Sequence, residues 1–157
     1  MTKNRKNEFL GLSLAHAGEM AYAEDAPGTC ALLGHLNSFF RYLCGNPESV
    51  ILKDEIRACE SYVAIQQISA PSALTVTIDL AEELGETMIT RFAVIDLLDR
   101  YVVSLRESWS GGVAVRMDLF RSAGGSAAEG AAPGGAALQC RLYAEDRAAP
   151  VVVNPLS

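Results

Sequence analysis

Apolar residues recur at helical spacing through the first third of the chain. In CALLGHLNSFFRYLCG (30–45), Leu32, Leu36 and Phe39 lie three or four positions apart and belong to a broad apolar face. A weaker helical pattern precedes it in EFLGLSLAHAGEMAYA (8–23), where two glycines lower the helix propensity. A face this broad needs cover from more than one neighbour. The pattern therefore predicts a helical hairpin that pairs with a second hairpin into a four-helix bundle.

Helical and alternating patterns follow one another in the rest of the chain. Helical spacing is found at 50–69 and from about 88 to 106, and apolar residues alternate with polar ones at 72–80, 113–120 and 138–142. The tail APVVVNPLS is expected to add a short edge strand. The order helix, helix, break, helix, strand, helix, strand, strand predicts an α+β fold, in which the hairpin is followed by a small sandwich of helices and strands.

The composition narrows the class of function. The net charge of −6 and the pI of about 4.9 disfavour a nucleic-acid-binding surface. No apolar run is long enough to span a bilayer, and the N-terminus lacks the pattern of a signal peptide. The four cysteines are widely spaced, without a CxxC pair, and are expected to be reduced, buried thiols. We therefore expect a soluble cytoplasmic protein that has no membrane segment and binds no nucleic acid.

The stretch AGGSAAEGAAPGGA (123–136) is rich in glycine and alanine and has no apolar periodicity. It lacks the GxGxxG or Walker spacing and the lysine that grips phosphate, so it predicts a flexible loop and not a nucleotide-binding loop. The cysteines and histidines of the chain do not cluster at ligand spacing either. No metal site is therefore expected.

The strongest clue to function lies between residues 36 and 68. A phrase that ends the second helix is followed, after a short turn, by another phrase in the third helix. The residues that carry the two phrases are Leu36, Arg41, Tyr42, Leu52, Glu55, Ile56, Tyr62, Ile65 and Gln66. In order and spacing they resemble the LSxLLRY-like and LxxEIxxxxxYLxIQxxR phrases of sensor histidine kinases of the LytS/YesM type.

The resemblance implies two domains. Residues 1–46 would form the dimerisation and phosphoacceptor hairpin, and residues 47–157 would form a truncated ATPase-like α/β sandwich of the Bergerat (GHKL) class. Kinases of this family bind Mg-ATP and transfer its γ-phosphate to a histidine on the first hairpin helix. They then pass the phosphoryl group to an aspartate of a response regulator. Each of these chemical parts can be compared with the present sequence.

The residue expected to accept the phosphoryl group is replaced. The family's phrase PHFLFNxLN aligns best with NEFLGLSLA (7–15), which puts Glu8 where the histidine belongs. A carboxylate cannot form the phosphoramidate that makes phosphohistidine transferable. His16 and His35 lie away from the motif. We expect a structural or surface role for both, because neither has a positioned base in the sequence pattern.

The residues expected to bind nucleotide are also replaced. Alignment of ITRFAVIDLLDRYVVSL (89–105) with the family's IPxLLLQPLVENAIKHG puts Asp99 in place of the glutamate and Arg100 in place of the magnesium-binding asparagine. Magnesium requires oxygen ligands, whereas a guanidinium offers only donors and a positive charge. Asp96, Asp99 and Arg100 are therefore expected to line a remnant nucleotide cleft, with Asp96 and Arg100 placed to pair across a helical turn.

The adenine-reading motif of the family, DxGxG, is not found in the sequence. Asp146 is the nearest candidate, but it lies about two positions late and no glycine follows it. The second glycine-rich lid of the family is not found either. All three parts of the kinase chemistry thus depart from the family pattern, while the alternation of helices and strands is kept.

These departures favour a catalytically inactive histidine-kinase-like signalling protein in a two-component-type pathway. It would act as a homodimer and through contacts with a sensor kinase or a response regulator, and no cofactor is expected. One alternative is an active ATP-binding kinase fragment, in which Asp96 or Asp99 binds Mg²⁺ and Arg100 holds phosphate. The other is an unrelated, monomeric α+β binding module.

Overall fold

The computed structural model describes residues 3–45, 47–69, 74–108, 112–121, 137–144 and 152–156. Its helices are α1 (Lys3–Ala23), α2 (Pro27–Cys44), α3 (Leu52–Ser69) and α4 (Ala93–Ser108), with a short 3-10 helix η1 at Glu82–Leu84. Its strands are β1 (Ser49–Ile51), β2 (Leu74–Leu80), β3 (Met88–Thr90), β4 (Val113–Arg121), β5 (Leu138–Ala144) and β6 (Val152–Pro155).

The larger of the two sheets in the described residues has the strand order β2-β4-β5-β6. β2 runs parallel to β4, whereas β5 is antiparallel to both β4 and β6. The smaller sheet pairs β1 with β3 in antiparallel register, so that Val50 lies opposite Ile89. This small pair joins the start of α3 to the segment that leads into α4.

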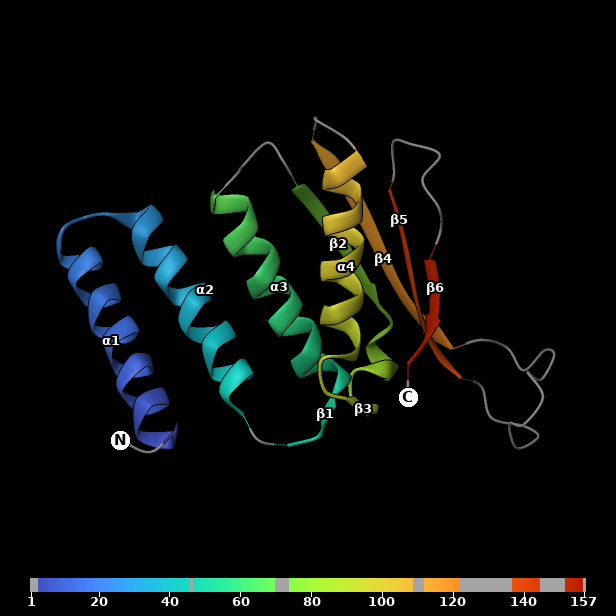
Figure 1. Cartoon of the computed structure of the whole chain (residues 1–157), viewed down its shortest axis with the longest axis horizontal. Helices are drawn as coiled ribbons and strands as arrows, with labels where there is room; N and C mark the ends of the chain where they lie inside the picture. The colour runs from blue at the N-terminus through green and yellow to red at the C-terminus, as the bar shows by residue number, and fades with distance from the viewer. Residues whose placement is uncertain are drawn as a thin grey trace.

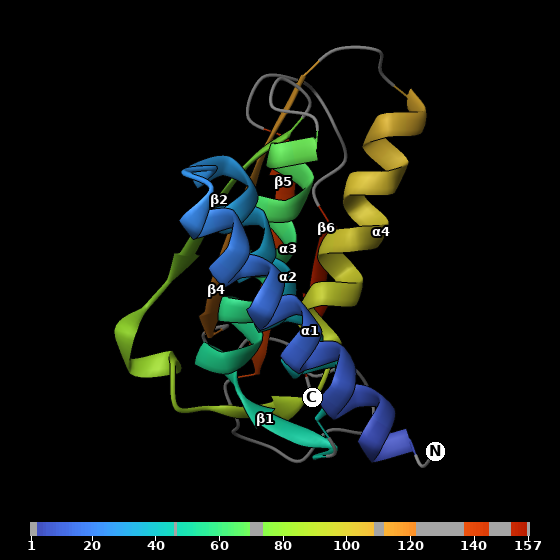
Figure 2. The ribbon, with the colours of Figure 1, turned by 90° about the vertical axis from the view of Figure 1, so that its left-hand side faces the viewer.

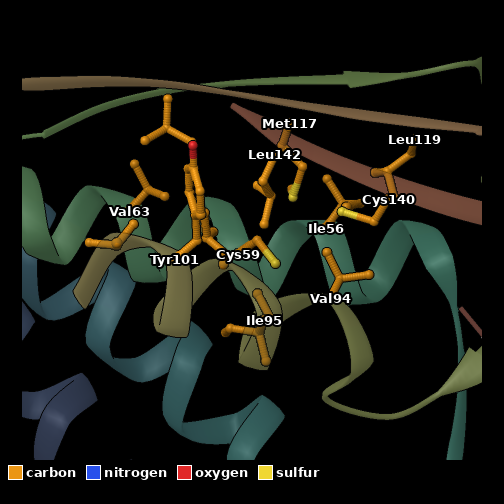
Figure 3. Packing of buried hydrophobic residues seen from close by; sticks show 14 of the residues in the cluster. Ile56, Cys59, Val63, Val94, Ile95, Tyr101, Met117, Leu119, Cys140 and Leu142 are labelled. Atoms are coloured by element: carbon orange, nitrogen blue, oxygen red, sulfur yellow. The ribbon is translucent and has the colours of Figure 1, made fainter. Parts of the chain in front are cut away.

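Helices α3 and α4 cover one face of the larger sheet, as Figure 1 shows. Successive side chains of a strand point to opposite faces of the sheet, and the helices cover one face. Every second residue of β4 and β5 is therefore buried. These residues are Val113, Val115, Met117, Leu119, Leu138, Cys140, Leu142 and Ala144. Figure 3 shows Ile56 and Cys59 of α3 and Val94 and Tyr101 of α4 packed towards these strands. The opposite face is polar, with Arg116 paired to Asp79 and Asp118.

The α1–α2 hairpin packs against the outer side of α3, away from the sheet (Figures 1 and 2). The turn of the hairpin includes Asp25 in the left-handed region (φ 54°), and Pro27 begins α2, where its missing N–H is not needed. None of the residues of α2 is buried, and Ala21 is the one buried residue among the side chains described for α1. The hairpin is therefore covered on one side only within a single chain.

The predicted α+β class and the order of the main helices and strands are confirmed, including the edge strand at the end of the chain. All four predicted helix starts differ from the structure. α1 begins at Lys3 and α2 at Pro27, whereas the patterns predicted starts at residues 8 and 30. The helix expected from residue 50 begins at Leu52, and the helix expected from about residue 88 begins at Ala93, because β1 and β3 occupy the preceding positions. Apolar residues in a three-residue strand pair fit a helical pattern equally well. The predicted loop 123–136 lies outside the described residues.

Two further expectations concern the membrane and the cysteines. Among the helices described, none combines the length and apolar character that crossing a bilayer requires. All four cysteines are free; Cys59 and Cys140 are buried in the core, as predicted, whereas Cys30 and Cys44 of α2 are only half-buried. The difference arises because Cys59 and Cys140 belong to the core between the helices and the sheet, whereas α2 has no buried residue.

Candidate functional site

The three residues predicted to line a remnant nucleotide cleft lie on the solvent side of α4. Asp96, Asp99 and Arg100 are all exposed, while their neighbours Val94, Ile95 and Leu98 are buried against the rest of the domain. The Nε of Arg100 donates a hydrogen bond to the backbone carbonyl of Asp96 (3.0 Å). The ion pair expected between these two side chains is not among the contacts of the described residues, so that expectation is wrong. The guanidinium is held by its own helix instead.

Asp99 is connected to the neighbouring helix. The hydroxyl of Tyr62, on α3, donates a hydrogen bond to Oδ1 of Asp99 on α4 (2.6 Å). The ring of Tyr62 also packs at 6.1 Å, centroid to centroid, from Phe39 of α2. One of the three residues of the predicted site is therefore tied to the α2–α3 side of the molecule.

A buried carboxylate caps the start of α4. Glu55, on α3, is fully buried (0% exposed). Its Oε1 accepts hydrogen bonds from the backbone N–H groups of Val94 and Ile95, and its Oε2 accepts one from Phe92, each at 3.1 Å. The second and third N–H groups of a helix normally bond the side chain of the preceding cap residue. Phe92 occupies that cap position and has no acceptor, so a carboxylate from another helix takes its place.

The backbone of Phe92 explains why this outside cap is needed. Phe92 has φ 69°, a left-handed conformation that a bulky residue rarely adopts. Its N–H is fixed by Glu55 and its carbonyl accepts the N–H of Asp96 (3.0 Å). The negative charge of Glu55 also lies at the positive end of the α4 dipole. Glu55 thus stabilises both the unusual backbone and the helix that follows it.

The hairpin reaches the same carboxylate through Tyr42. The Tyr42 hydroxyl, on α2, donates a hydrogen bond to Oε2 of Glu55. Burial of the phenol, together with its hydrogen bond to Glu55 and the charge of that carboxylate, raises the pKa of Tyr42 well above its usual range. The Tyr42 ring meets the Phe92 ring edge-on (centroids 5.6 Å apart), and the Arg91 guanidinium lies 4.8 Å from the Tyr42 centroid. Three helices therefore converge on Glu55.

Glu8, which the resemblance aligns with the phosphoacceptor, and the two histidines lie elsewhere. Glu8 and His16 are exposed on α1, and Figure 1 places α2 and α3 between that helix and α4. The Nδ1 of His16 lies 3.6 Å from Oε2 of Glu19. His35 is half-buried on α2. The described residues contain no group of three or more His, Cys, Asp or Glu side chains that could hold a metal ion. Asp146 lies outside the described residues.

Glu55, Tyr42 and Arg91 were not predicted to be parts of a site, although Glu55 and Tyr42 carry the family resemblance. A signal was present for Glu55. It lies three positions after Leu52 and four before Cys59, which places it on the apolar stripe of α3. An acidic residue at such a position is rarely buried without partners. The identity of those partners depended on the approach of α2 and α4, which no local pattern contains.

Comparison with known proteins places the resemblance on the same part of the molecule. The family model described as Histidine kinase matches residues 4–74, which span α1, α2, β1 and α3. This match supports a histidine-kinase-like family and a signalling role of that kind. A search of curated proteins returns no match.

Proposed function

We propose that the protein is a catalytically inactive histidine-kinase-like signalling protein. Its α1–α2 hairpin (within residues 1–46) pairs with the hairpin of a second copy into a four-helix bundle. Its remaining part (47–157), related to the GHKL sandwich, serves contacts with partners. One observation carries the proposal: the exposed face of α1 holds a row of apolar side chains beside Glu8, the residue at the phosphoacceptor position.

The apolar row consists of Phe9, Leu12 and Met20. These side chains are 62%, 66% and 53% exposed, and their spacing of three and eight positions puts them on one side of the helix. Exposed apolar side chains grouped in this way are typical of an interaction surface. A second copy of the hairpin offers the matching face, since a twofold interface uses the same patch on both subunits. Pairing would give α1 the cover that it lacks within one chain.

The chemistry available on the two candidate surfaces supports a non-catalytic role. Glu8 offers a carboxylate at the phosphoacceptor position, and Arg100 offers a guanidinium at the position of the metal-binding asparagine. The Arg100 Nε is already bonded to the Asp96 carbonyl, and Asp99 accepts a bond from Tyr62. The Arg100 guanidinium has no oxygen ligand to offer Mg²⁺ at the position where the family has its asparagine. A sensor kinase or a response regulator is the partner class that fits a hairpin of this family.

Sedimentation tests the pairing. The chain is expected to sediment as a dimer, and Leu12→Glu is expected to make it monomeric by placing a charge within the apolar row. Tyr22→Glu is the matched control, because Tyr22 is 80% exposed on α1 but lies off the row. Its dimer is expected to persist. A wild-type chain that stays monomeric at high concentration would refute the pairing.

A thermal-shift titration with Mg-ATP tests the inactivity. A ligand that binds only the folded state must raise the melting temperature, and millimolar Mg-ATP is expected to leave it unchanged. Incubation with Mg-ATP is likewise expected to leave the chain unphosphorylated. A clear rise in melting temperature would contradict the proposal and support the active kinase alternative.

One observation favours that alternative. His16 is exposed on the same face of α1 as the apolar row, and its Nδ1 lies 3.6 Å from the Glu19 carboxylate. A histidine with a neighbouring carboxylate has a group that can receive its proton while the other ring nitrogen attacks. Under this second candidate function the chain would be phosphorylated at His16. Loss of phosphorylation by Mg-ATP in His16→Gln, while His35→Gln is still phosphorylated, would establish this second function.

A further inference from the structure

A cavity of about 670 Å³ opens between α2 and α3, next to the turn that precedes α4. Three arginines from separate segments line it: Arg41 in the last turn of α2, Arg57 on α3 and Arg91 in the turn after β3. In Figure 1 these elements meet at the lower ends of α2 and α3. The cavity is distinct from the predicted nucleotide cleft, whose residues lie on α4.

Arg91 is held in place before any ligand arrives. Its guanidinium carbon lies 4.8 Å from the ring centroid of Tyr42 and 4.5 Å from that of Phe92. Its Nη1 donates to the carbonyl of Gly45. Its Nε is buried and has no hydrogen-bond partner among the described residues. The stacking fixes the position of this positive group. A buried N–H donor normally has a hydrogen-bond partner, which the Nε of Arg91 lacks among the described residues.

The charged and apolar residues that line the cavity determine which kind of ligand it can bind. Arg57 is 3.4 Å from the Asp54 carboxylate, so part of its charge is balanced within α3, and Glu60 also reaches the lining. Arg41 and Arg91 are the cations that face the cavity from the other two segments. Apolar wall is supplied by Val50 and other residues. The volume lies within the range of small-molecule sites, about 300 to 1,000 Å³.

We propose that this cavity, at the junction of α2 and α3, binds a small organic anion: a carboxylate or phosphate group on an apolar body. The anionic group would lie between Arg41 and Arg91, and the body would lie against the apolar wall. Such a ligand would contact Tyr42 and Arg91, both of which hold the hairpin to the start of α4. Binding would therefore favour the observed packing of α2 against α3. The proposal does not depend on dimerisation or on the loss of catalysis.

An NMR titration at constant ionic strength tests the site. The probes are phenyl phosphate and benzoate, which separate a phosphate source from a carboxylate source. At least one is expected to shift, saturably, backbone amide signals around the cavity, such as those of Ser38, Ala58 and Arg91. Each charge-assisted hydrogen bond contributes enough that Arg41→Gln and Arg91→Gln should weaken binding about tenfold. Arg41 is exposed, so its variant is expected to fold normally even if Arg91→Gln does not.

Arg121→Gln is the matched control, because it removes the same charge at the exposed end of β4. Its affinity for the probe is expected to equal that of the wild type. The proposal is overturned if neither probe gives saturable shifts, or if the shifts centre on α4. It is also overturned if Arg41→Gln binds the probe as tightly as Arg121→Gln does.

Discussion

The hydroxyl of Tyr42, near the end of the hairpin, donates a hydrogen bond to the buried carboxylate of Glu55 on α3. The same carboxylate accepts the N–H groups of Phe92, Val94 and Ile95 at the start of α4. The position of the hairpin is therefore connected, through one side chain, to the helix on which the predicted nucleotide residues lie. A shift of α2 would remove one partner of Glu55 and change the cap of α4.

Glu55→Gln is expected to lower the free energy of unfolding by about 2 kcal/mol. The amide can still accept from Val94 and Ile95, but its NH₂ group would face the N–H of Phe92, and the charge-assisted bonds would be lost. Urea denaturation measures the change. Glu60→Gln, an exposed position on the same helix, is expected to change stability by no more than about 0.5 kcal/mol. Equal stability of the two variants would show that Glu55 is not the cap described.

Tyr42→Phe is expected to accelerate hydrogen exchange at the start of α4. The variant keeps the ring packing against Phe92 and removes only the hydroxyl that Glu55 accepts. The amides of Val94 and Ile95 report the change, because they are bonded to the same carboxylate. Tyr62→Phe is the matched control, since it loses a hydroxyl bonded to Asp99, one helical turn beyond Ile95. Unchanged exchange at Val94 and Ile95 in Tyr42→Phe would contradict the coupling.

Two glycines at the hairpin should respond in opposite ways to alanine. A Cβ at Gly34, in the middle of α2, would meet no atom within 4 Å, so Gly34→Ala is expected to stabilise the protein by about 1 kcal/mol. A Cβ at Gly45 would lie 3.1 Å from Nη2 of Arg91, which is fixed by its stacking on Tyr42. Gly45→Ala is therefore expected to destabilise it. Thermal unfolding of both variants would show whether Arg91 is held as rigidly as its contacts indicate.

The stability of the fold should decline at alkaline pH. Burial, followed by the charge of Glu55, raises the pKa of Cys59, and burial, followed by the charge of Asp118, raises that of Cys140 to about 12. Above a pH of about 8.5 the unfolded chain releases these thiol protons while the folded chain keeps them, so unfolding becomes more favourable. The expected slope is about 1.4 kcal/mol per pH unit for each thiol.

Urea denaturation at pH 8, 9 and 10 measures this slope, and Cys140→Ala should make it shallower than in the wild type. Stability that stays constant from pH 8 to pH 10 would contradict the burial of the two thiols.

The larger helices and strands could be predicted from the sequence because they follow local periodicity. The alternation in β4 reflects one covered face, and the apolar stripe of α3 marks the side of that helix that packs towards the sheet; both patterns appear as predicted. The starts of α3 and α4 could not be predicted, since β1 and β3 exist only by pairing with each other across some forty residues of chain. A three-residue strand has no periodicity of its own to reveal it.

The same distinction between what the sequence predicts and what the tertiary structure decides applies to the residues of the candidate site. The sequence by itself determined which chemical groups α1 and α4 carry: Glu8, which the family resemblance aligns with the phosphoacceptor, and Asp96, Asp99 and Arg100 on α4. Only the tertiary structure decided what those groups contact. Arg100 bonds the Asp96 carbonyl and Asp99 accepts from Tyr62. The buried charge of Glu55 is satisfied by donors some forty residues away, because burying it requires partners that only the packing of three helices can supply.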